Sequence, residues 1–160
     1  MQEGKTVKFV TFNIRLDWQR DGENNFVFRQ PLILRTLDRE QPDLICFQEV
    51  LPHVAAWLKE NLKDYTVVGC GREKGLRGEQ VSVAFRTERF SLMHMDTFWL
   101  SPTPFTVGSR YEVQSDCPRT CAELLLQLTG TDQVIRVVNT HLDHEGRPAR
   151  EDRKSTRLNS

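Results

Sequence analysis

Short apolar runs that end in polar residues alternate with helical patterns over the first third of the chain. The runs predict strands over residues 7–13 and 43–49, the second apolar enough to be buried on both faces. Apolar residues at helical spacing predict helices over residues 28–39 and 51–62, with Pro31 and Pro52 in their first turns. The order strand, helix, strand, helix is typical of the beginning of an α/β fold.

The second half of the chain has the pattern of a β-sheet. Strands are predicted over residues 65–69, 79–86, 90–100, 122–129 and 134–139. Residues 71–78 are expected to form a charged, glycine-punctuated loop, and residues 101–119, with three prolines, a long irregular connection. Long loops in compact domains are often binding loops.

Several predicted strands carry a polar residue on their apolar face, at one end. Asn13 shares parity with Val7 and Phe9, Glu49 with Ile45 and Phe47, and Glu79 with Val81 and Val83; Asn139 and His141 follow Ile135 and Val137 in the same way. A buried carboxylate is costly unless a cation or hydrogen-bond donors meet it, so these ends are expected to share a pocket. Such oxygen-rich groups with few carboxylates suit Mg²⁺, with Mn²⁺ as a possible substitute, whereas no histidine or cysteine pair supports zinc.

Composition and charge indicate the class of protein and its location, but they do not indicate a ligand. The chain has 160 residues, 38% hydrophobic and 28% charged, with no long apolar tract, which predicts one soluble domain without a transmembrane segment. Four cysteines without CxxC spacing and an N-terminus without an apolar signal favour reduced thiols and a cytoplasmic location. The formal charge is zero, so electrostatics alone does not indicate a nucleic-acid ligand.

The last eight residues, RKSTRLNS, have a different character from the rest. They carry three positive and no negative charges, show no apolar period and resemble a translated sequencing adapter. Residues 153–160 are therefore expected to be a non-native tail after an incomplete domain over residues 1–152. Without these three basic residues the net charge is −3.

Three blocks of this sequence resemble a known family in the same order. The sequence is similar to the endonuclease/exonuclease/phosphatase superfamily of metal-dependent phosphoester hydrolases in the segments TFNIR (11–15), QPDLICFQEV (41–50) and VNTHLDH (138–144). The similarity extends to FWLS (98–101) and the loop around Arg119. The resemblance covers roughly residues 6–150. It implies a four-layer α/β/β/α sandwich of the DNase I-like type (α+β in content), truncated after roughly the first sheet and its helices.

The resemblance also implies a role for each matching residue. Glu49 is similar to the family's Mg²⁺ ligand, and Asn13 to the amide beside the metal. His141 resembles the histidine that assists the leaving oxygen, with Glu79 as the carboxylate that orients it, a pairing that favours proton donation near neutral pH. Asn139 and Arg119 are expected to contact substrate, Arg119 because a guanidinium matches phosphate oxygens.

The sequence also departs from the family's pattern. The Gly-Asp-x-Asn block, whose side chains activate water, and the late Asp-His pair are absent, and Phe26 stands where a tryptophan is usual. The 160-residue chain is therefore expected to be inactive, and its intact form to be an enzyme. A lone sheet would also leave an apolar face exposed, which predicts poor solubility or partial order.

Other interpretations stay open for individual residues. Glu79 could be an ordinary charge between a loop and a strand, and Asp143 and His144 could belong to a solvated turn. Trp18 could line a substrate groove or anchor its loop on the fold, and Arg15 and Arg29 could approach phosphate.

The functional hypotheses fall into two classes. The first is Mg²⁺-dependent hydrolysis of a phosphomonoester or phosphodiester in a phosphorylated small molecule, a lipid headgroup or a nucleic acid. The second is a non-catalytic fragment or relative that binds a partner. Neither the substrate, the oligomeric state nor the organism follows from the sequence.

Overall fold

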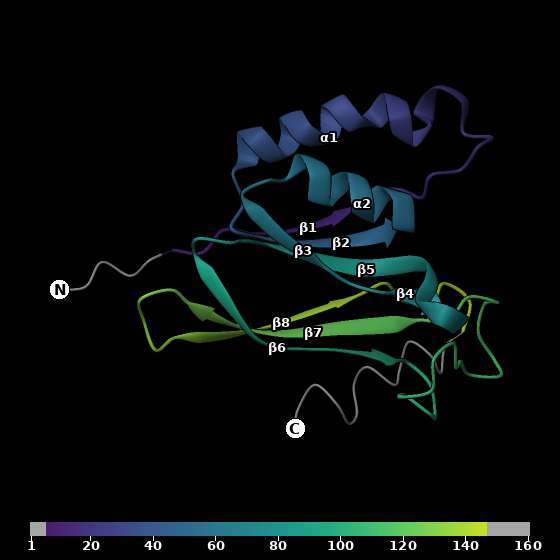
Figure 1. Ribbon diagram of the computed structural model, residues 1–160. Coiled ribbons are helices and arrows are strands. Elements are labelled where there is room, and N and C mark those ends of the chain that lie inside the picture. Colours follow the sequence, from purple (N-terminus) through teal and green to yellow (C-terminus); the bar gives the residue numbers. More distant parts are fainter. Residues whose placement is uncertain (1–5, 147–160) are drawn as a thin grey trace.

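The computed structural model describes residues 6–146, in which two α-helices and two β-sheets form three layers (Figure 1). The expected tail at residues 153–160 lies outside the described residues. Neither α-helix of residues 6–146 has the length and apolar character needed to cross a bilayer.

The first sheet combines parallel and antiparallel pairs. Its central path runs β1 (Phe9–Asn13), β2 (Leu44–Val50), β5 (Arg77–Arg86) and β3 (Tyr65–Val68), and β4 (Gly71–Glu73) also pairs with β5. β1 and β2 are parallel, whereas β5 is antiparallel to β2. The C-terminal ends of β1 and β2 therefore lie near the beginning of β5, at the same end of the sheet.

The two helices cover one face of this sheet. α1 (Phe26–Glu40) and α2 (Pro52–Asn61) lie above it in Figure 1. A cluster of buried side chains fills the layer between them, and includes Ile33, Leu37, Ile45, Phe47, Val54 and Leu58. The 3.6-residue spacing of these apolar positions on each helix explains why one face of each helix is buried.

The second sheet covers the opposite face of the first. It consists of β6 (Phe90–Trp99), β7 (Thr120–Leu128) and β8 (Val134–Thr140), all antiparallel. The core between the sheets includes Leu44, Val83, Phe85, Leu124, Leu126 and Val137. The alternation of apolar and polar residues in β7 predicts such a half-buried strand, and each of its even-numbered apolar residues is buried.

The sandwich type is confirmed, but the chain contains more of it than the sequence suggested. Three strands of the second sheet are present, so the expectation of a lone sheet with an exposed inner face is wrong. The predicted strands and helices are all found within a few residues of their expected bounds. The exception is the expected loop at residues 71–78, which contains β4 and the short helix η2 (Lys74–Leu76).

The start of α1 also differs from expectation. The helix begins at Phe26, because the Asn25 side chain accepts a hydrogen bond from the Val27 backbone N–H and caps it. Pro31 therefore lies inside the helix and not in its first turn.

Candidate active site

The neighbouring ends of β1 and β2 bring Asn13 and Glu49 together. Asn13 Nδ2 donates a hydrogen bond to Glu49 Oε1 at 2.8 Å, and Asn13 Oδ1 accepts one from the Arg15 backbone N–H. The other carboxylate oxygen, Glu49 Oε2, accepts a hydrogen bond from the Leu16 backbone N–H at 2.6 Å. Both carboxylate oxygens are thus oriented by neighbouring donors.

The backbone of Glu49 is unusual. Its φ angle is 62°, and the register between β2 and β5 shifts between Phe47 and Val50. A non-glycine residue in the left-handed region costs free energy, and such residues cluster at functional sites. This irregularity places Glu49, which is partly exposed, at the edge of an otherwise buried strand.

His141 lies directly after β8 and between two carboxylates from the other sheet. Its Nε2 atom is 3.8 Å from Glu49 Oε1, and its Nδ1 atom is 3.5 Å from Glu79 Oε1. The structure therefore brings together four of the residues selected from the sequence: Asn13, Glu49, Glu79 and His141. The pairing of Nδ1 with Glu79 leaves Nε2 on the side that faces Glu49.

Glu79 has a second partner, Arg72, which the sequence did not single out. Arg72 Nη1 donates a hydrogen bond to Glu79 Oε1 at 2.8 Å, and both side chains are about 10% exposed. The Trp99 indole N–H in turn donates to the Arg72 carbonyl oxygen. Arg72 stands in a charged stretch that reads as a loop, so no pattern in the sequence indicated that its guanidinium is buried.

The surroundings of Glu79 favour its ionised form. Burial acts to raise the pKa of this carboxyl group, but its hydrogen bond with His141 and the charges of Arg72, His141 and Arg119 outweigh it and hold the pKa below the usual value. Glu79 is therefore an anion at neutral pH and can fix the orientation of the His141 ring.

Asn139 occupies a different place from the one predicted for it. Its side chain is 2% exposed, and Nδ2 donates to the carbonyl oxygens of Phe47 and Ser82 while Oδ1 accepts from Gln48 Nε2. These bonds join β8 to β2 and β5. Asn139 is thus a buried link between the two sheets, and its side chain does not contact an open site, contrary to the prediction that it binds substrate.

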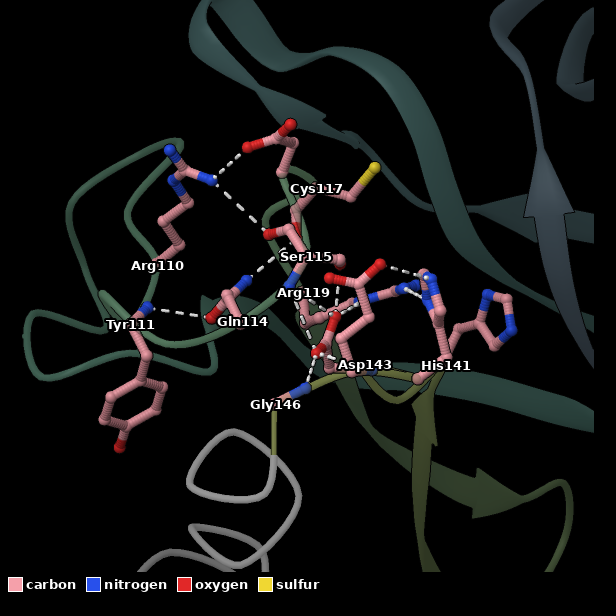
Figure 2. A network of polar contacts seen from close by, with 12 residues as sticks. Arg110, Tyr111, Gln114, Ser115, Cys117, Arg119, His141, Asp143 and Gly146 are labelled. Atoms are coloured by element: carbon pink, nitrogen blue, oxygen red, sulfur yellow. Dashed lines mark hydrogen bonds and ion pairs between the residues drawn. The ribbon is translucent and has the colours of Figure 1, made fainter.

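Arg119 also lies in the interior, in a network centred on Asp143 (Figure 2). Arg119 is 5% exposed, its Nε atom is 3.3 Å from Asp143 Oδ1, and its Nη2 atom is 3.2 Å from His144 Nδ1. The guanidinium is therefore held by a buried carboxylate, and Arg119 also lines a small hollow together with Glu79 and His141. The contact of Arg119 with phosphate stays a prediction.

Asp143 fastens the long connection between β6 and β7 to the end of β8. Its carboxylate accepts hydrogen bonds from the Ser115 backbone N–H and hydroxyl and from the backbone N–H groups of Glu145 and Gly146, as Figure 2 shows in part. Burial acts to raise the pKa of Asp143, but these hydrogen bonds and Arg119 hold it well below the usual value. Asp143 is buried, so it does not belong to a solvated turn.

The loop that follows β1 is held by Arg29 of α1. The guanidinium donates to four backbone carbonyl oxygens, those of Ile14, Arg15, Leu16 and Asn24. Arg29 therefore has a structural role, and Arg15 forms a two-pronged ion pair with Asp21. His53 of α2 contacts Asp17 of the same loop at 2.7 Å.

The residues that converge here fit an open magnesium site better than a closed metal cage. Within residues 6–146 no group of three or more histidine, cysteine, aspartate or glutamate side chains is arranged to hold a metal. Zinc needs three or four protein ligands, whereas Mg²⁺ commonly uses one or two carboxylates and completes its shell with water and substrate oxygens. Glu49, already oriented by Asn13 and Leu16, is the carboxylate that would serve it.

Solved structures of known proteins resemble this chain over most of its length. The sequence matched neither a family model nor a curated protein. Among solved structures, an endonuclease/exonuclease/phosphatase from Bacteroides vulgatus is 31% identical, with a TM-score of 0.88 over 91% of this chain and 56% of that one. A mannosyl-6-phosphatase from Bacteroides thetaiotaomicron is 28% identical, with a TM-score of 0.84 over 92% of this chain and 55% of that one.

A more distant likeness extends the fold beyond these bacterial proteins. TDP2 of D. rerio, solved with a single-strand DNA product, is 16% identical, with a TM-score of 0.63 over 85% of this chain and 46% of that one. The chain thus spans about half the length of the structures that it matches. With a shared sandwich, sequence identity near 30% to its bacterial neighbours and the family's blocks at the strand ends, the chain belongs to the endonuclease/exonuclease/phosphatase superfamily.

Proposed function

We propose that this site serves the hydrolysis of a phosphoester, with Mg²⁺ held by Glu49 and with Mn²⁺ able to replace it. The observation that carries the proposal is the convergence of Asn13, Glu49, Glu79 and His141, which lie at or next to the ends of four strands in two sheets. Phosphatase activity in the name of a relative 28% identical to this chain supports the same class of reaction.

Each side chain has a definable task in this proposal. Asn13 and the Leu16 backbone N–H hold the two oxygens of Glu49, so the carboxylate keeps one orientation. Glu79 accepts from His141 Nδ1 and leaves Nε2 to donate a proton to the departing oxygen. Bound Mg²⁺ would supply neutralisation of the negative charge on the phosphoryl group.

The activation of water is not accounted for by these residues. Two carboxylates within residues 6–146 contact His141. Glu79 is paired with Arg72 and His141, and Glu49 accepts hydrogen bonds from Asn13 and the Leu16 N–H. We assign no general base among the described residues. The 160-residue chain by itself is therefore proposed to bind metal and phosphate without turnover.

The relatives support two substrate classes. One acts on a phosphorylated sugar by its name, and TDP2 was solved with single-strand DNA. A local contact with a small phosphoester or with one end of a nucleic acid agrees with a chain whose formal charge is zero, because an extended nucleic-acid footprint requires a basic surface.

Calorimetric binding of inorganic phosphate, with Mg²⁺ or with EDTA, tests the proposal. Phosphate is expected to bind in Mg²⁺ and to lose most of its affinity in EDTA or in Glu49→Gln. His94→Gln, on an exposed part of β6, is the control and should bind as the unchanged chain does. Binding that is indifferent to both EDTA and Glu49→Gln would contradict the proposal.

A parallel assay follows the release of product from a generic phosphodiester and a phosphomonoester. No turnover above background is expected from the 160-residue chain. EDTA-sensitive turnover would refute its inactivity while supporting the assigned chemistry.

A further inference from the structure

Trp18 is an exposed tryptophan on a loop that is otherwise fixed. Its side chain is 58% exposed, so it does not anchor the loop on the fold. Its backbone carbonyl oxygen accepts hydrogen bonds from the Asp21 N–H and from Asn25 Nδ2. A single exposed apolar side chain is common on a protein surface, but a rigid backbone beneath a large ring is a feature of binding sites.

The neighbours of Trp18 hold the loop from three directions. Asp17, the preceding residue, accepts from the Phe26 N–H and contacts His53 on α2. Arg29 ties the carbonyl oxygens at residues 14–16 and 24 to α1. The Leu16 N–H reaches the carboxylate of Glu49. Trp18 therefore lies on a loop that is hydrogen-bonded to Glu49, the proposed metal ligand.

The position of Trp18 places it within reach of a substrate bound at Glu49. The Leu16 nitrogen lies 2.6 Å from Glu49 Oε2. Two residues extend the chain by at most roughly 7 Å, so the Trp18 backbone is within roughly 10 Å of that carboxylate. The organic group of a small phosphoester bound at Glu49 and His141 can span such a distance.

The hydrogen bonds of the loop indicate which kind of group would pack there. The side chains of Arg15, Asp17, Asp21 and Asn25 are already paired with one another, with His53 or with the backbone. A hydroxyl-rich sugar needs several ordered polar partners. A nucleobase needs mainly a ring face, because stacking on an aromatic side chain is sufficient and tolerates any base.

The other polar side chains of this loop do not favour a sugar over a nucleobase. Gln19, Arg20 and Glu23 are long and exposed, with no described hydrogen bond. Ordering such side chains around a ligand costs conformational entropy. The rigid feature that the loop presents is the indole.

We propose that Trp18 is a stacking platform for the planar base of a nucleotide whose phosphate occupies the Glu49 and His141 site. The proposal rests on the function proposed above, since it takes the position of the phosphate from it. It assigns a substrate class, nucleotides or the ends of nucleic acids, and makes Trp18 a specificity-determining residue. A sugar phosphate is the rival that the experiment must separate.

The test is an NMR titration of the 160-residue chain in Mg²⁺ with adenosine 5′-monophosphate and, separately, with glucose 6-phosphate. The chain has three tryptophans and hence three indole N–H signals, and Trp18→Phe identifies that of Trp18. Adenosine monophosphate is expected to shift the Trp18 signal strongly, and glucose 6-phosphate only slightly. The signals of Trp57 and Trp99 report that each variant is folded.

Affinities of two variants complete the test. Base stacking contributes about 1–3 kcal/mol, so Trp18→Ala should weaken binding of adenosine monophosphate about 5- to 150-fold, while Trp18→Phe retains most of it. Binding of glucose 6-phosphate should be the same in all three proteins.

The outcomes separate this inference from the proposed function. If both ligands shift the Asn13 side-chain amide but Trp18→Ala binds adenosine monophosphate normally, the stacking platform is refuted and the phosphate site stands. Equal shifts of the Trp18 signal by glucose 6-phosphate would also refute it. If neither ligand affects Asn13, both proposals are refuted.

Discussion

Asn139 and His141 lie two residues apart, on the same face of the chain, and yet have different tasks. Sequence parity places them on one face, together with Ile135 and Val137. Asn139 is buried and bonded on both sides of its amide, whereas His141 is about one third exposed beside Glu49. The odd-numbered positions predict that the two side chains share a face of the strand. They do not predict at which residue that face passes from the core to the surface, because this depends on how the other sheet packs.

Replacement of Asn139 tests its role as a link between the sheets. Asn139→Ala removes the hydrogen bonds that the carbonyl oxygens of Phe47 and Ser82 and the Gln48 amide make with this side chain. A buried unsatisfied group costs about 1–3 kcal/mol, so the free energy of unfolding should fall by about 2 kcal/mol or more in urea denaturation. Asn24→Ala, on the surface, is the control. An unchanged midpoint would show that the link is unimportant.

The carboxylate of Asp143 predicts a dependence of stability on pH. Because its pKa in the folded protein lies below the unfolded value of about 4, its contribution is present above that pH and is lost as the pH falls. Asp143→Asn removes a partner of buried Arg119 and should cost about 3 kcal/mol at pH 7.

The quantity to measure is the difference in the free energy of unfolding between the unchanged chain and Asp143→Asn. Urea unfolding from pH 7 down to pH 2 should show the unchanged chain and Asp143→Asn converging below about pH 4. Exposed Asp132→Asn should follow the unchanged chain throughout. A constant difference at every pH would contradict the assigned ionisation.

At the scale of elements, periodicity identified the strands and helices, and the Asn25 cap set the start of α1. The apolar spacing predicted both helices and all strands except β4, which has three residues and begins at a glycine. So short a strand has no period of its own, and its pairing with β5 is a tertiary effect. For the same reason the sequence could not indicate Arg72, whose burial depends on that pairing.

The loop between β1 and α1 is expected to depend on a single side chain. Arg29→Met removes all four hydrogen bonds from the guanidinium to the loop carbonyls. Hydrogen exchange of the backbone amides at residues 15–25 should accelerate, with little change in β2 or β5. Arg35→Met, on the exposed side of the same helix, is the matched control. Equal exchange in the two variants would contradict the role given to Arg29.

At the scale of the whole molecule, the site exists only because two sheets pack together. Glu49 and Glu79 belong to the first sheet, and His141 follows a strand of the second. Figure 1 shows these two sheets packed on each other. The family's sequence blocks indicated which residues meet, because each block places a polar residue at a strand end. They could not show that Asn139 and Arg119 are buried, since burial is set by Gln48, Asp143 and the long connection between β6 and β7.

The most direct test of the proposed metal site is a titration of the 160-residue chain with Mg²⁺, followed by NMR. Saturable shifts are expected for the Asn13 side-chain amide, the Leu16 backbone amide and the His141 ring. They should vanish in Glu49→Gln and persist in Glu88→Gln, an exposed control. Shifts elsewhere in the chain, or the same shifts in Glu49→Gln, would contradict the proposed metal site.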